Sequence, residues 1–107
     1  MTTLLTWYFL TTPTAAYWHN EVPNYPIRPD YTTNACACPK YYPFGTVFLF
    51  RRLGTNLYST AVCLDRTKSG DTFDAWPALA KDLGFGPSYS NDIGVVPVQF
   101  WPLNTRR

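Results

Sequence analysis

The chain has 107 residues, 46% of them hydrophobic and 15% charged, with a formal net charge of +2. These values predict a single domain over residues 1–107 with one modest core, and they exclude a disordered tail. The weak charge predicts no nucleic-acid partner, and no apolar run reaches the roughly 20 residues that span a bilayer. Because no positive charge precedes Arg28, we expect no secretory signal.

The pattern along the chain predicts a mostly β protein with six short strands and one small helix. A segment of 24 residues, 11–34, interrupts this pattern, and its four prolines predict a long ordered loop. The helix is expected to begin at Pro77 and to end near Leu83, before Gly84. The strands are expected at residues 3–10, 35–38, 46–52, 57–64, 73–74 and 93–101. This tally predicts a closed or partly closed β-barrel.

Two compositional features, 18% aromatic residues and ten prolines, indicate a small and rigid fold. Filling the core is the favoured role for the aromatic rings, and a surface on which sugars stack is the alternative. Pro97 interrupts the last strand and lacks a backbone donor, so we expect an edge strand or a bulge there.

The three cysteines, Cys36, Cys38 and Cys63, are an odd number, which argues against a complete disulfide framework. Buried free thiols are favoured, and a disulfide from Cys63 to Cys36 or Cys38 is the alternative. A zinc site needs four ligands, and His19 is the single histidine, so we predict neither a metal nor another cofactor.

An acidic cluster is the best candidate for chemistry. Asp65, Asp71 and Asp74 fall within ten residues, and Asp74 lies between Phe73 and Trp76. Apolar neighbours and a second carboxylate both raise the pKa of a carboxyl group, which suits it to donate a proton near neutral pH. The competing interpretation, favoured by the local sequence, is that Asp74 caps the helix that follows.

Several motifs occur in an order that resembles a known family. The motifs are Ala35-Cys36-Ala37-Cys38-Pro39 with Pro43-Phe44-Gly45-Thr46-Val47, then Val62-Cys63-Leu64-Asp65-Arg66, Gly70-Asp71-Thr72-Phe73-Asp74 and Gly94-Val95-Val96-Pro97-Val98. Together they resemble the double-psi β-barrel domains of rare lipoprotein A, the expansins and the three-aspartate domain of membrane-bound lytic transglycosylase A. The resemblance covers about two-thirds of the chain.

The resemblance implies a six-stranded double-psi barrel with a groove for a polysaccharide. It implies that Asp74 is the catalytic acid and that Asp65 supports it. In the lytic transglycosylases of this group, one carboxyl protonates the glycosidic oxygen of peptidoglycan and then accepts the proton of the sugar's own 6-hydroxyl. Trp7, Tyr8 and Trp76 are the candidate surfaces for sugar binding.

The chain departs from the family pattern at three places. The loop between Asp65 and Asp74 is shorter, Thr67 replaces a glycine, and Cys38 replaces an aspartate. Two functions therefore remain open. The first is a peptidoglycan-cleaving enzyme, phage-encoded or present in a phage lysate, that acts at the bacterial cell wall. The second is a non-catalytic glycan-binding or structural module of a virion, which would bind other virion proteins.

Overall fold

A computed structural model describes residues 1–7, 32–67, 72–86 and 94–104. These residues form six strands and one short helix, as expected. The strands are β1 (Thr2–Trp7), β2 (Ala35–Cys38), β3 (Val47–Arg52), β4 (Tyr58–Arg66), β5 (Phe73–Ala75) and β6 (Val95–Pro102), and the helix is α2 (Pro77–Asp82).

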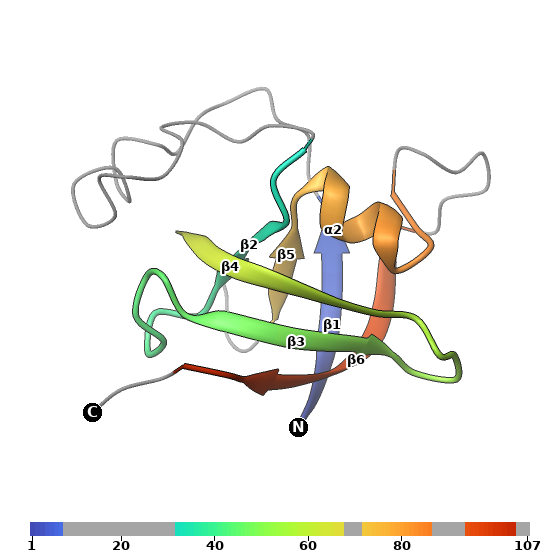
Figure 1. The fold of residues 1–107 in the computed structure, drawn as a ribbon, viewed down its shortest axis with the longest axis horizontal. Coiled ribbons are helices and arrows are strands. Elements are labelled where there is room, and N and C mark those ends of the chain that lie inside the picture. Colours follow the sequence, from blue (N-terminus) through green and yellow to red (C-terminus); the bar gives the residue numbers. More distant parts are fainter. Residues whose placement is uncertain (8–31, 68–71, 87–93, 105–107) are drawn as a thin grey trace.

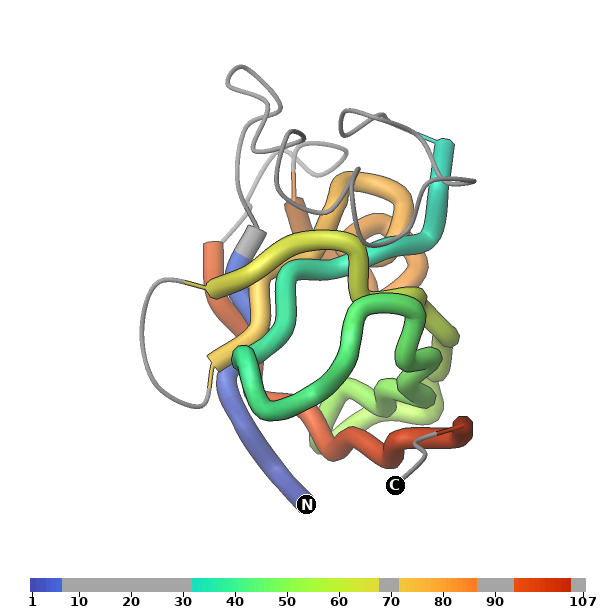
Figure 2. Tube along the Cα trace, turned by 90° about the vertical axis from the view of Figure 1, so that its left-hand side faces the viewer, coloured from blue at the N-terminus to red at the C-terminus, as the bar shows by residue number. Residues whose placement is uncertain are grey.

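The six strands close into a barrel in the order β1-β5-β2-β4-β3-β6 (Figure 1). The β1–β5 and β2–β4 pairs are parallel, and the other four pairs are antiparallel. Helix α2 lies at one end of the barrel, and Met1 lies at the opposite end (Figures 1 and 2). Parallel strands need a crossover between them, so the barrel interlocks segments that are far apart in the chain.

The barrel has an internal two-fold order. Exchanging β1 with β4, β2 with β5 and β3 with β6 leaves the ring of neighbours unchanged. The same exchange converts the parallel β1–β5 pair into the parallel β4–β2 pair, and the reverse. Each half of the chain therefore supplies three strands in an equivalent arrangement, and the second half contributes β4, β5 and β6.

Aromatic rings fill the barrel, which confirms the favoured role of these residues. Phe48 and Phe50 alternate with less buried neighbours along β3, so both rings point inward. The Phe48 ring meets the Phe73 ring edge-on, with 5.0 Å between centroids, and Phe100 lies 4.9 Å from Phe73. Such edge-to-face contacts add to the free energy gained from burial.

Helix α2 begins at Pro77, as predicted, because the first helical residue needs no backbone donor. Leu83 is its C-terminal cap, and Gly84 follows with a φ of +81°, a conformation that glycine adopts without strain. Arg52 Nη1 donates hydrogen bonds of 3.0 Å to the carbonyl oxygens of Leu83 and Gly84. The helix end is therefore fastened to β3.

The expectation of an edge or a bulge at Pro97 is wrong, and the expected loop at 11–34 lies mostly outside the described residues. Pro97 marks neither an edge nor a bulge, since β6 pairs with β1 and β3 without a shift of register. Pro97 lies just beyond the end of the pairing with β3, and its carbonyl oxygen accepts a hydrogen bond of 3.0 Å from the backbone nitrogen of Leu53. Of the predicted loop 11–34, only residues 32–34 are described, and positions 8–10 of the first predicted strand also lie outside.

The favoured state of the cysteines was wrong for two of the three. Cys38 and Cys63 form a disulfide, and their Cα atoms are 5.7 Å apart. Cys36 is a buried free thiol. The alternative pairing through Cys38 is therefore the correct one, because β2 and β4 are neighbours in the barrel.

Candidate functional site

Four residues on four adjacent strands form a row across the barrel wall. Thr6 on β1 lies opposite Asp74 on β5, and Asp74 lies opposite Ala37 on β2. Ala37 in turn lies opposite Asp65 on β4. Strand β2 lies between β4 and β5 in the barrel, so Ala37 is the residue that separates the two aspartates. The fold thus brings together both carboxyls that the sequence singled out.

Asp74 is partly exposed, and its carboxyl group is in a setting that favours the protonated form. Burial raises the pKa of Asp74, and repulsion from the Asp65 carboxylate raises this pKa further. The Thr6 hydroxyl donates a hydrogen bond to Asp74 Oδ1. Asp74 therefore combines access to solvent with a raised pKa and a fixed orientation, which are the properties of a general acid.

Asp65 is buried, with 3% of its surface exposed. Its Oδ1 atom accepts a hydrogen bond of 2.8 Å from the backbone nitrogen of Arg66. A buried carboxylate held in this way acts on its neighbour through its charge rather than by contact with a large substrate. The geometry therefore gives the two aspartates different roles, with Asp74 accessible and Asp65 beneath the surface.

Asp74 does not cap the helix, although the local sequence favoured that interpretation. It is the middle residue of β5, and the N-cap position of α2 is Trp76. No side chain donates or accepts a capping hydrogen bond there. The cap interpretation failed because Asp74 is held between β1 and β2, and Pro77 at the first helical position leaves one fewer backbone donor to satisfy.

Cys36 is the third titratable group at the site. Its thiol is buried, and burial followed by repulsion from Asp74 and Asp65 raises the pKa of Cys36. The thiol is therefore protonated at neutral pH and is a poor nucleophile. Cys36 lies directly opposite Cys63 in the β2–β4 pairing.

Thr6 is a residue that the sequence analysis missed. It lies on β1, 68 positions before Asp74, and no local motif links the two residues. Only the parallel β1–β5 pairing places Thr6 opposite Asp74. The order Thr-Thr-Leu-Leu-Thr-Trp along residues 2–7 does not alternate between polar and apolar residues, so the sequence held no signal that singled out Thr6.

The three aromatic candidates for sugar binding have different outcomes. Trp76 is completely buried beside Ala35 and Leu64, so it offers no surface to a sugar ring. Trp7 is the last residue of β1 and lies opposite Ala75, while Tyr8 lies outside the described residues. The proposed roles of Trp7 and Tyr8 therefore stay predictions, and Trp76 belongs to the core.

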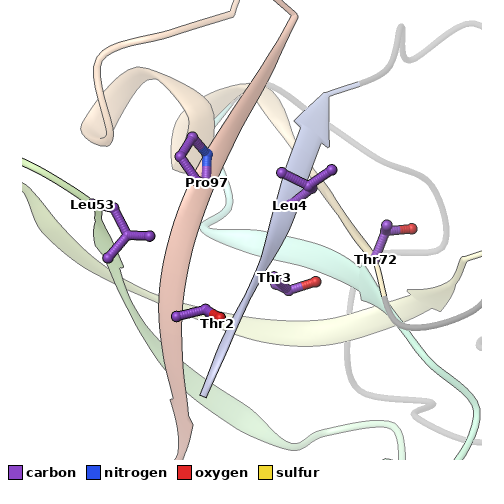
Figure 3. Close-up of a pocket in the computed structure, with 6 residues that line it drawn as sticks. All are labelled: Thr2, Thr3, Leu4, Leu53, Thr72 and Pro97. Carbon is purple, nitrogen blue, oxygen red and sulfur yellow. The ribbon is translucent and has the colours of Figure 1, made fainter.

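A hollow of about 380 Å³ lies beside the row of four residues rather than over it (Figure 3). Figure 3 shows residues of β1 between Pro97 of β6 and Thr72, which precedes β5. Neither carboxyl lines this hollow. Its lining is Thr2, Thr3, Leu4, Leu53, Thr72 and Pro97.

Within the described ranges, no group of three or more histidine, cysteine, aspartate and glutamate side chains is arranged to hold a metal ion. No helix in this part of the chain has the length and hydropathy needed to cross a membrane. Asp71 lies outside the described residues.

Comparison with protein-family models gives no matching family, and comparison with curated proteins gives no match.

Proposed function

We propose that this chain cleaves the glycan strands of peptidoglycan by lytic transglycosylation, with Asp74 as the acid and base. The observation that carries the proposal is the accessible carboxyl of Asp74, whose pKa is raised by burial and by Asp65. The ordered motifs at residues 35–47, 62–66, 70–74 and 94–98 support the same assignment. So does the closed barrel, which has the six strands that the resemblance implies.

In the proposed reaction, the protonated Asp74 carboxyl donates its proton to the glycosidic oxygen as the bond from this oxygen to the sugar carbon breaks. The 6-hydroxyl oxygen of the same sugar then attacks that carbon, and the Asp74 carboxylate accepts the hydroxyl proton. Atoms and charges balance without an added water molecule, so a second carboxylate that activates water is unnecessary. One accessible aspartate meets the requirement.

Asp65 assists this reaction through its charge. A carboxyl group with an ordinary pKa near 3.9 is almost entirely ionised at neutral pH and has no proton to donate. The negative charge of Asp65, one strand removed across Ala37, makes ionisation of Asp74 less favourable. We propose that Asp65 is a positioning and tuning residue and makes no contact with the glycan.

The test is incubation of the protein with purified peptidoglycan, followed by mass spectrometry of the soluble products. The proposal expects anhydro-muropeptides from the wild type and a loss of at least about 100-fold in Asp74→Asn. The matched control is Asp82→Asn, which removes an exposed carboxylate on α2. Equal product release by wild type and Asp74→Asn would refute the assignment of Asp74.

A second candidate function is a glycan-binding module without catalysis, such as a component of a virion. The observation that favours it is the position of the 380 Å³ hollow, which is lined by β1, β6 and neighbouring residues and not by Asp74. This function predicts binding of the wild type to insoluble peptidoglycan without soluble products. Asp74→Asn would then bind equally, whereas Leu4→Asp in the hollow would weaken binding.

A further inference from the structure

The pairing between β2 and β4 changes register at the candidate site. Cys36 lies opposite Cys63, but the next residue, Ala37, lies opposite Asp65. Leu64 is therefore the extra residue of a β-bulge, which interrupts the ladder of hydrogen bonds. Without this shift, Leu64 would face Ala37 and Asp65 would move one position away from Asp74. The juxtaposition of the two carboxyls thus depends on a locally irregular pairing.

The disulfide crosses this bulge. Cys38 lies opposite Arg66 in the ladder, yet it is bonded to Cys63, three positions earlier on β4. The disulfide therefore spans the part of the β2–β4 pairing in which Ala37 lies opposite Asp65. Sliding β2 by one residue toward the C-terminal end of β4 would carry the Cα atoms of Cys38 and Cys63, now 5.7 Å apart, beyond the distance that a disulfide bridges, since each residue of a strand advances about 3.3 Å.

We propose that the Cys38–Cys63 disulfide fixes the register that pairs Asp65 with Asp74, so that the site is complete only when these two cysteines are oxidised. Formation of the bond converts two thiols to one disulfide while a small-molecule disulfide is reduced to two thiols. Such oxidation is typical of compartments outside the reducing cytoplasm. The loss of catalysis that we expect on reduction rests on the proposed function, whereas the loss of the pairing between Asp65 and Asp74 does not.

The surroundings of Cys36 protect the bond once it has formed. A thiolate at Cys36 could attack Cys63, which lies opposite it, and release Cys38. Burial opposes the formation of that thiolate, and the charges of Asp74 and Asp65 oppose it further. Burial of all three cysteines and the carboxyl pair together therefore suppress the thiol exchange that would break the disulfide.

The experiment compares the pKa of Asp74, measured by ¹³C NMR, in three proteins. In Cys38→Ala/Cys63→Ala, the pKa of Asp74 should fall toward its ordinary value, with a loss of peptidoglycan cleavage of about tenfold for each unit of that fall. In Asp82→Asn, a control on α2 that keeps the disulfide, the pKa of Asp74 and the rate of cleavage should both remain as in wild type. A folded double variant with the wild-type pKa of Asp74 would overturn the proposal.

A second measurement covers the case in which the double variant fails to fold. Wild-type protein is refolded with oxidised glutathione or with excess dithiothreitol, and backbone hydrogen exchange is followed. The proposal expects the reduced protein to lose protection at residues 35–38 and 62–66 while β3 and β6 keep theirs. Unfolding of the whole reduced chain would overturn it, because the bond would then stabilise the barrel in general. If the wild type cleaves no glycan, the proposed function fails, while the NMR comparison still decides this inference.

Discussion

Asp65 and Asp74 lie on the two strands that border β2, and each lies opposite the same β2 residue. They are nine positions apart in the chain, and β4 and β5 flank β2 on opposite sides. The relationship is electrostatic, because repulsion from Asp65 contributes to the raised pKa of Asp74. An accessible acid and a buried, negatively charged neighbour are the core of the functional account.

Removal of the Thr6 hydroxyl is expected to raise the pKa of Asp74 further. The hydroxyl donates to Asp74 Oδ1, and a donor stabilises the ionised carboxylate more than the neutral acid. We expect Thr6→Val to raise this pKa and Thr6→Ser, which keeps the hydroxyl, to restore it, as measured by ¹³C NMR titration. A decrease in Thr6→Val would contradict this account, since it would mean that the Thr6 hydroxyl mainly accepts a hydrogen bond from the protonated Asp74 carboxyl.

Substitution of Asp74 by asparagine is expected to stabilise the fold at neutral pH. The pKa of Asp74 is higher in the folded than in the unfolded chain, so the folded state binds more protons between the two values. The contribution of Asp74 to stability is therefore lost as pH rises from about 3.9 through its raised pKa. Urea unfolding of wild type and Asp74→Asn should show a difference that grows over this window and is constant above it. A difference that shrinks as pH rises would contradict the direction of the shift.

Substitutions at two glycines separate backbone strain from crowding at the end of α2. Gly54 and Gly84 have similar φ values of +78° and +81°. A Cβ atom at Gly54 would have no neighbour within 4 Å, whereas one at Gly84 would lie 3.1 Å from Arg52 Nη1, which caps the helix. We expect Gly54→Ala to cost about 1 kcal/mol and Gly84→Ala about 1 kcal/mol more, measured by urea unfolding. Equal costs would show that Arg52 adjusts without losing its hydrogen bonds.

The local elements could be predicted from the sequence because each has a local cause. The β-branched and aromatic segments became strands, and Pro77 and Gly84 bound the helix at nearly the expected positions. The prediction of Asp74 as half of an acidic pair also followed from neighbouring residues. These features depend on propensity, turn chemistry and short spacing, which one sequence displays directly.

The remaining features depend on which strands become neighbours, and one sequence does not display that. Thr6 joined the site through a pairing with a strand 68 positions away. The choice of Cys38 as the partner of Cys63 depended on the neighbouring positions of β2 and β4 in the barrel. Trp76 was predicted to lie on the surface, but it packs beneath the barrel wall because β5 and α2 meet there.

The measurement that most directly tests the account is the titration of the Asp74 carboxyl in wild type, Asp65→Asn and the control Asp82→Asn. We predict a pKa above the ordinary value of about 3.9 in wild type and Asp82→Asn, and a lower value in Asp65→Asn, where the repulsion is removed. An ordinary pKa in wild type, or a raised one that Asp65→Asn leaves unchanged, would contradict the claim that these two aspartates form a functional pair.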